Sequence, residues 1–218
     1  MKTLLPFFLL LVCFQATSQT SSELKKQGYI FFLHNKFIED QGLEGVHPEY
    51  GRTEYKETVQ AFEKQGFIVV SERRPKNTEV KSYALKVLGQ IDSLLKKGIP
   101  PSHITVIGTS KGGYIAMEVS SQLKNPEVNF VFVGCCSGAE PTAVPEFNFC
   151  GRILSIYEKS DVVGRSCQNL KNQSTYSVSD FKEIELHTGL KHGFLFKPLK
   201  EWVDPSVAWA RRQDRGRR

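Results

Sequence analysis

One stretch of this sequence, residues 104–114, predicts a strand, a sharp turn and a helix in immediate succession. It opens with four β-branched residues, Ile-Thr-Val-Ile, which are typical of a buried strand. Gly108 and Gly112 then flank Ser110, and a helical pattern begins just after Gly112. A G-x-S-x-G pattern between a strand and a helix predicts a tight turn that exposes the serine hydroxyl. The two glycines have a steric reason, because larger side chains would clash where strand and helix approach.

Apolar runs and amphipathic patterns alternate along the rest of the chain. Six runs predict strands, at 28–33, 67–71, 104–107, 128–133, 153–157 and 181–186. The runs at 28–33 and 67–71 predict buried strands, whereas 181–186 alternates apolar and polar residues. Apolar residues at steps of three and four predict helices at 53–65, 80–97, 114–123 and 198–212. Such alternation is typical of βαβ units. The sequence therefore predicts an α/β fold, a three-layer sandwich in which a mostly parallel sheet of about six strands carries helices on both faces.

The first 18 residues have the parts of a secretory signal peptide. Met1-Lys2 is basic, and the 11 residues from Leu4 to Phe14 are apolar but too few to cross a membrane. The small residues Ala16-Thr17-Ser18 form a cleavage site, so we expect a secreted or periplasmic chain that begins near Gln19. An uncleaved signal anchor is the alternative. Residues 19–210 then form one domain, and residues 211–218 form a basic tail.

The charge of the chain does not by itself indicate a partner. The formal net charge is +6, and loss of Lys2 with the signal peptide leaves +5. Much of this charge lies in the tail from Arg211 to Arg218, which could attract nucleic acid or an anionic surface. Aromatic residues do not alternate with these basic residues as they do in a nucleic-acid groove. We therefore expect a solvated terminus, no nucleic-acid partner, no membrane span after cleavage, and a monomer.

Four cysteines remain after cleavage, at positions 135, 136, 150 and 167. Disulfides form in exported proteins, and four cysteines allow three complete pairings. A bond between the adjacent Cys135 and Cys136 would be strained, which favours a bridge from one of them to Cys150 or Cys167. The spacing is not that of a zinc site, so we expect no metal and no cofactor.

Polar residues follow three of the predicted strands. Ser110 follows the third, Asp161 follows the fifth, and His192 follows the sixth. Parallel sheets bind ligands beyond the carboxyl ends of their strands, so these side chains are expected to meet. A serine hydroxyl needs a base to take its proton, and an imidazole titrates in the right range. His192 is the expected base, and Asp161 is expected to orient it.

Several alternatives to this assignment remain open. Glu158 could be the acid, and Asp161 could instead cap a helix. His187 lies on the strand pattern, which favours a packed or surface side chain. His34 is expected to be a structural hydrogen-bonding group, and His47 and His103 show no readable pattern.

These motifs resemble those of the α/β-hydrolase superfamily. The elbow at 108–112, the strand 153–156 followed by Asp161, and the loop Lys191-His192-Gly193-Phe194 occur in the superfamily's order of serine, acid and histidine. The resemblance covers nearly all of the mature chain. It is to small, lidless serine hydrolases, similar to esterases and dienelactone hydrolases, that lack the first two strands. It implies a nucleophilic Ser110.

The resemblance also implies an oxyanion hole made by two backbone N–H groups. One is that of Lys111, directly after the serine. The other comes from the loop after the first strand and is expected to be that of Lys36, with Phe37 as the alternative. This loop reads His34-Asn35-Lys36-Phe37 and lacks the glycine that many members of the superfamily have after the histidine.

Three functions fit this sequence. The favoured one is an exported serine hydrolase that cleaves small esters through an acyl-enzyme on Ser110. A peptidase or thioesterase could use the same three side chains, since nothing in the sequence distinguishes the bond that is cleaved. A binding protein that has lost catalysis is the third, and the unusual loop at Asn35–Phe37 is its only support.

Overall fold

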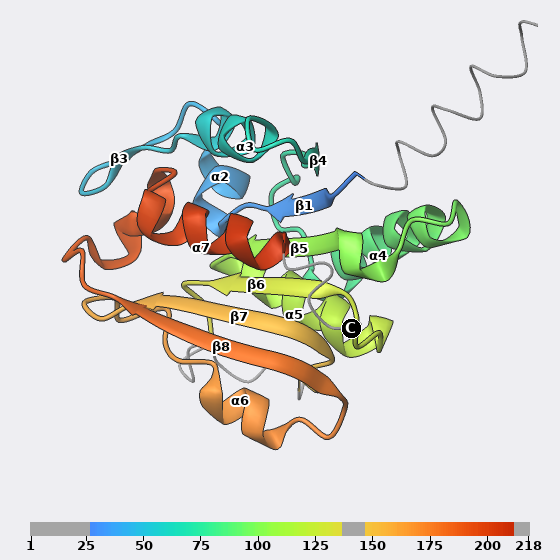
Figure 1. The fold of residues 1–218 in the computed structure, drawn as a ribbon. Coiled ribbons are helices and arrows are strands. Elements are labelled where there is room, and N and C mark those ends of the chain that lie inside the picture. The colour runs from blue at the N-terminus through green and yellow to red at the C-terminus, as the bar shows by residue number, and fades with distance from the viewer. Residues whose placement is uncertain (1–26, 137–146, 212–218) are drawn as a thin grey trace, which may run out of the picture.

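The computed structural model describes residues 27–136 and 147–211 (Figure 1). The predicted signal peptide, most of the loop between the fourth and fifth predicted strands, and residues 212–218 of the basic tail lie outside the described residues. None of the helices in the described ranges is long and apolar enough to span a membrane.

Six parallel strands form the central sheet, in the order β4-β1-β5-β6-β7-β8. Their bounds are β1 Tyr29–Leu33, β4 Ile68–Val70, β5 Ile104–Thr109, β6 Asn129–Val133, β7 Gly151–Glu158 and β8 Val178–Leu186. All six predicted strands are present, and each lies within a few residues of its expected position. The predicted α/β fold with a sheet of about six strands is confirmed.

Burial along the sheet follows the strand order. Every residue of β1, β5 and β6 is buried, as continuous apolar runs predict. The expectation that the strand at 67–71 is buried is wrong, because β4 is an edge strand and Ile68 is 36% exposed. The opposite edge strand, β8, alternates apolar and polar residues as predicted, because one of its faces meets solvent.

Helices cover both faces of the sheet (Figure 1). On one face, α4 (Val80–Lys96) and α5 (Lys111–Leu123) bury residues such as Ile91 and Met117. On the other face, α3 (Tyr55–Glu63) and α7 (Lys200–Ala210) bury Phe62 and Trp202, whose rings lie 6.1 Å apart. The two apolar clusters on either side of the sheet therefore make three layers.

Short elements account for most differences from the sequence prediction. Residues after β1 were expected to form a loop but form helix α2 (Lys36–Gln41), because the Asn35 side chain accepts a bond from the Ile38 N–H. The strands β2 (Val46–His47) and β3 (Gly51–Arg52) form a small antiparallel pair, and α6 (Gln168–Gln173) follows the β7 loop. These segments have too few residues for a periodic pattern.

Helix α5 begins at Lys111, three residues earlier than its apolar pattern indicates. Its first turn contains Gly112 and Gly113, which have low helix propensity. Close packing explains both glycines. A Cβ on Gly112 would overlap the backbone carbonyl of Leu33, and one on Gly113 would overlap the side chain of Cys135. The helix can approach the end of β1 and the segment after β6 only because these positions carry no side chain.

Gly112→Ala is expected to destabilise the fold by at least about 3 kcal/mol, since the added methyl group has no space to enter. The matched control is Gly89→Ala in α4, where a Cβ meets nothing within 4 Å. That substitution should increase stability by about 0.5–1 kcal/mol, because alanine favours a helix. Urea unfolding of both variants measures the difference, and equal stabilities would contradict this account.

Candidate functional site

Ser110 lies at the carboxyl end of β5, immediately before α5. Its backbone has φ 48° and ψ −118°, a conformation that side-chain-bearing residues rarely adopt. The turn is held by the Ser110 N–H, which donates to the Val133 carbonyl at 2.9 Å, and by the Gly113 N–H, which donates to the Ser110 carbonyl at 2.8 Å. A Cβ on Gly108 would overlap the Gly112 backbone. The strained conformation therefore depends on the two flanking glycines.

His192 lies in the short helix η2 (Lys191–Phe196), which follows β8. Its Nε2 lies 3.0 Å from the Ser110 Oγ, and its Nδ1 lies 2.7 Å from the Asp161 Oδ2. The imidazole side chain is 18% exposed and the Asp161 side chain is fully buried. The three residues that the sequence analysis singled out thus form one continuous chain of contacts.

Asp161 follows β7 in a loop that is anchored at several points. Its Oδ1 accepts the Val163 N–H at 2.8 Å, while its backbone N–H donates to the Glu158 carbonyl at 3.0 Å. No helix begins at Asp161, so the capping alternative is wrong. One carboxylate oxygen accepts a bond from the loop backbone and the other bonds to the imidazole. These two contacts fix the orientation of the carboxylate.

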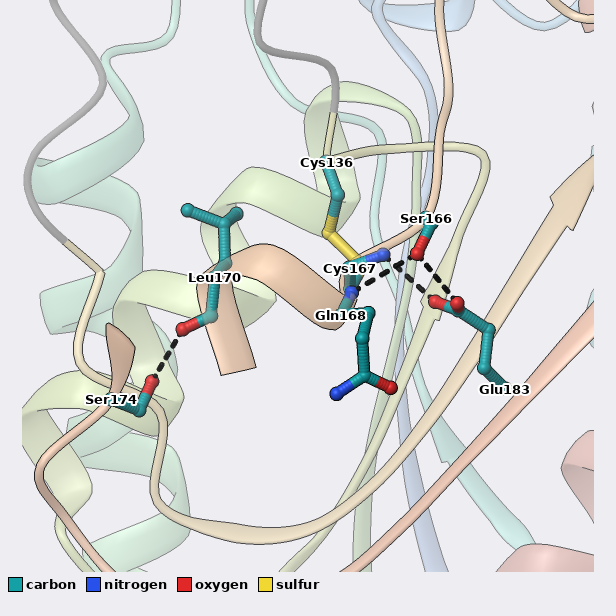
Figure 2. The surroundings of a disulfide bond; sticks show 7 residues. All are labelled: Cys136, Ser166, Cys167, Gln168, Leu170, Ser174 and Glu183. Carbon is teal, nitrogen blue, oxygen red and sulfur yellow. Dashed lines mark hydrogen bonds between the residues drawn. A yellow bond between two sulfur atoms is a disulfide. The ribbon is translucent and has the colours of Figure 1, made fainter. Parts of the chain in front are cut away.

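A disulfide between Cys136 and Cys167 joins the end of β6 to the end of the Asp161 loop (Figure 2). Figure 2 also shows Ser166 and Cys167 bound to the carboxylate of Glu183 on β8. These contacts measure 2.6 Å from the Ser166 Oγ and 2.8 Å from the Cys167 N–H. The Arg165 N–H donates to the Cys135 carbonyl at 2.8 Å. Covalent and polar contacts together hold the loop against two strands.

Glu158, the alternative acid, has a different set of partners. Its carboxylate accepts bonds from the backbone and hydroxyl of Thr188, from Ser160 and from the Gly189 N–H. It is not among the groups bonded to His192. Burial would raise the pKa of Glu158, but these donors outweigh burial and lower it to about 2. Glu158 therefore joins the loop after β7 to the loop after β8.

The two expected oxyanion donors occupy equivalent positions. Lys36 is the first residue of α2 and Lys111 is the first residue of α5, and the first N–H groups of a helix have no partner within it. The strands that precede these helices are neighbours, with Leu33 paired to Gly108. Both helices thus begin at the same edge of the sheet, where their N-termini favour negative charge.

The remaining histidines have other surroundings. His34 is buried, with its Nδ1 2.8 Å from the Asn35 carbonyl oxygen and its Nε2 2.9 Å from the Arg74 backbone nitrogen. Burial, with a smaller contribution from the Arg74 charge, lowers its pKa to about 3. His47 stacks on Tyr50 with ring centres 4.3 Å apart. His187 is exposed beside Glu185, one residue past the end of β8.

Two groups of residues at this edge were not anticipated. Glu39 and Arg74 are fully buried and pair with each other at 3.2 Å, and Glu39 also pairs with Lys111 at 2.6 Å. Tyr50 packs so closely on Gly193 that a Cβ there would overlap its ring. Nothing in the sequence distinguishes Arg74 from a solvated arginine, because its burial depends on chain segments far apart.

A metal site is not favoured by the cysteines. The sulfur atoms of Cys135, Cys136 and Cys167 lie within 4.8 Å of one another, but two of them form the disulfide and offer no thiolate. The remaining Cys135 is buried, which raises the pKa of its thiol well above its usual range. This group of three sulfur atoms therefore does not fit a thiolate-bound metal ion.

Reduction of the disulfide should lower the free energy of unfolding by about 3–4 kcal/mol, since it releases a loop closed across 31 residues. Urea unfolding with and without dithiothreitol measures the change. The Cys136→Ala/Cys167→Ala variant serves as the control. Its stability should equal that of the reduced native chain, with or without dithiothreitol. Identical unfolding of the native chain in both conditions would contradict the pairing.

Glu158→Gln should lower stability by about 3 kcal/mol at pH 7, because the folded state holds the ionised carboxylate with several donors. The pKa is lower in the folded state than its ordinary value of 4.5, so this contribution is present above pH 4.5. It is lost as the pH falls toward 2. The stability difference between native chain and variant, measured by urea unfolding, should shrink over that range; a difference independent of pH would contradict the assignment.

No protein-family model and no curated protein matches the sequence. Solved structures do match its fold. Arabidopsis thaliana SOBER1 is similar over 86% of this chain and 99% of its own, with 13% identity and a TM-score of 0.57. An alpha-beta serine hydrolase homologue from Coxiella burnetii matches over 86% and 85%, with 15% identity and a TM-score of 0.53. Esterase PE8 matches over 86% and 93%, with 12% identity and a TM-score of 0.51.

The order of the strands, the turn at Ser110 and these structural matches agree with one another. At 12–15% identity the matches bear on the fold and not on the reaction. The chain has the fold of the α/β-hydrolase superfamily.

Proposed function

We propose that this chain is an exported serine hydrolase that cleaves small ester-type substrates through an acyl-enzyme on Ser110. One observation carries the proposal: the His192 imidazole contacts both the Ser110 Oγ, at 3.0 Å, and the Asp161 carboxylate, at 2.7 Å. A serine hydroxyl is a weak nucleophile at neutral pH, and an adjacent base is what activates it.

In the first half of the proposed reaction, the Ser110 Oγ attacks the ester carbonyl carbon while His192 Nε2 takes the hydroxyl proton. The C=O π electrons move to the carbonyl oxygen, which becomes an oxyanion. When the tetrahedral intermediate collapses, the bond to the alcohol oxygen breaks and His192 returns its proton to the leaving alcohol. Asp161 keeps Nδ1 protonated and stabilises the imidazolium. The acyl group is then bound to Ser110.

In the second half, water replaces the alcohol. His192 takes a proton from the water as its oxygen attacks the acyl carbon, and the collapse of the second intermediate returns that proton to the Ser110 Oγ. A carboxylic acid leaves and the serine is regenerated. In both halves the N–H groups of Lys36 and Lys111 are the proposed donors to the oxyanion, and one such donor typically contributes about 3–4 kcal/mol.

The loops that carry Asp161 and His192 expose apolar side chains, which supports an ester with an apolar group as the substrate. Val162 is 75% exposed and Val163 is 41% exposed, directly after Asp161, and Leu190 is 47% exposed, two residues before His192. Exposed apolar side chains on the loops that carry Asp161 and His192 support contact with an apolar substrate. Similarity to structures described as a serine hydrolase homologue and an esterase supports the same class of reaction.

Export is part of the proposal for two reasons. Residues 1–18 have the composition of a signal peptide. The disulfide between Cys136 and Cys167 is a bond that persists in oxidising compartments. The proposed location is therefore outside the cytoplasm, either secreted or periplasmic.

Ser110→Ala should reduce the turnover of a p-nitrophenyl ester by at least about 10³-fold, because it removes the hydroxyl that forms the proposed acyl-enzyme. The same variant should no longer react with a fluorophosphonate probe. Ser93→Ala is the matched control, since that residue is exposed on α4 and its hydroxyl donates to the Gly89 carbonyl of the same helix at 2.8 Å. It should keep full turnover and labelling.

Two outcomes would contradict the proposal. Undiminished turnover by Ser110→Ala would remove the serine from the reaction. A folded native chain that neither turns over esters nor reacts with the probe would favour the binding protein without catalysis.

A further inference from the structure

A buried ionic cluster lies directly behind the expected oxyanion donors. The Glu39 Oε1 accepts the Lys111 Nζ at 2.6 Å and the Thr78 N–H at 3.0 Å, and its Oε2 accepts the Arg74 Nε at 3.2 Å. The side chains of Glu39 and Arg74 are fully buried and that of Lys111 is 17% exposed. One carboxylate thus joins α2, α5 and the segment after β4.

Arg74 also binds the backbone that precedes Lys36. Its Nη2 donates to the His34 carbonyl and, at 3.4 Å, to the Asn35 carbonyl. The Asn35 carbonyl accepts a second bond from the His34 Nδ1 at 2.8 Å. Two donors on one side therefore hold the oxygen of the peptide group that joins Asn35 to Lys36.

The orientation of this oxygen determines the orientation of the Lys36 N–H. In a planar trans peptide the C=O and N–H bonds point in opposite directions. Since the Asn35 carbonyl faces Arg74 and His34 in the interior, the Lys36 N–H must face away from them. The N–H lies at the N-terminus of α2, where it has no partner within the helix.

We propose that Arg74 is a positioning residue for the oxyanion hole, which it serves by fixing the peptide plane between Asn35 and Lys36. The inference rests on the proposed function, since it assigns the Lys36 N–H as an oxyanion donor. Glu39 orients the guanidinium and also binds the side chain of Lys111, whose own N–H is the second donor. The cluster therefore fixes the positions of the two N–H donors relative to each other.

The state of His34 supports this role. Its low pKa of about 3, caused mainly by burial, keeps the imidazole neutral at physiological pH. The Arg74 N–H occupies the Nε2 acceptor at 2.9 Å, so Nδ1 carries the proton and donates to the Asn35 carbonyl. Arg74 thus acts on the same peptide twice, through its guanidinium and through the tautomer of His34.

Stability alone is a poor explanation for this cluster. Removing charges from water costs several kcal/mol per ion, and apolar residues of similar size often stabilise a fold as well or better. A forked guanidinium with a fixed carboxylate partner instead offers directional bonds. The backbone of the loop His34-Asn35-Lys36 is held by bonds from the side chains of Arg74 and His34.

The test compares Arg74→Met and Glu39→Gln with the native full-length chain. Each is assayed on an ester and on the matching thionoester, in which sulfur replaces the carbonyl oxygen. A developing sulfur anion accepts hydrogen bonds weakly, so an ordered oxyanion hole prefers the oxygen ester.

Arg74→Met should lower kcat for the ester by about 10- to 100-fold, with KM within about twofold. It should also lower the ester-to-thionoester ratio of kcat values by about tenfold or more.

Asp40→Asn is the matched control for Glu39→Gln. It removes the adjacent carboxylate on the same helix, which pairs with the exposed Lys36 side chain at 2.5 Å. It should leave kcat and the substrate ratio unchanged. If Arg74→Met fails to fold, Glu39→Gln carries the test, because it keeps the shape of the buried side chain; its substrate ratio should fall as well.

The outcomes separate this inference from the proposed function. A folded Arg74→Met or Glu39→Gln variant with an unchanged ester-to-thionoester ratio would overturn the positioning role, even if kcat falls. A native chain whose ester turnover equals that of Ser110→Ala would overturn the proposed function and this inference with it. A lower ratio in both variants, with Asp40→Asn unchanged, would support the positioning role.

Discussion

The approach of the α5 N-terminus to the ends of β1 and β5 is the contact on which the rest of this edge depends. Gly112 lies against the Leu33 carbonyl and Gly108 lies against the Gly112 backbone, with no space for a side chain at either position. This contact holds Ser110 at φ 48° and ψ −118°. It also brings the first residues of α2 and α5 to one place. A packing constraint between backbones thus produces both the exposed hydroxyl and the paired N–H groups.

The other parts of the site are held by buried charge. Asp161 and Glu39 are both fully buried carboxylates, and each has a cation or imidazole and a backbone N–H as partners. An isolated buried carboxylate would be costly, so its partners must be in place for the fold to be stable. Because Asp161 needs its imidazole partner, it keeps His192 in position. Glu39 keeps Arg74 and Lys111 in position for the same reason. Each of these two acids therefore joins loops that are distant in the sequence.

The sheet and its main helices could be predicted because their signal is local. A continuous apolar run such as residues 104–107 and a helical period such as that of 80–97 are visible within one segment. Ser110, Asp161 and His192 were identified because each follows a strand, and parallel strands end at one edge. The short helix α2 was missed because six residues with one N-cap give no periodic apolar pattern. The strand β4 was expected to be buried because an edge strand can be as apolar as a central one.

By itself, the sequence determined the order of strands and helices, the glycine turn around Ser110 and the three side chains that meet there. The physical reason is that burial periodicity and turn sterics act between residues close in the chain. Only the tertiary structure decided that Cys136 pairs with Cys167, that Glu158 binds Thr188 and not His192, and that Arg74 is buried against Glu39. These outcomes depend on which loops meet in space, and a charged or thiol side chain looks the same in sequence whether it is solvated or paired.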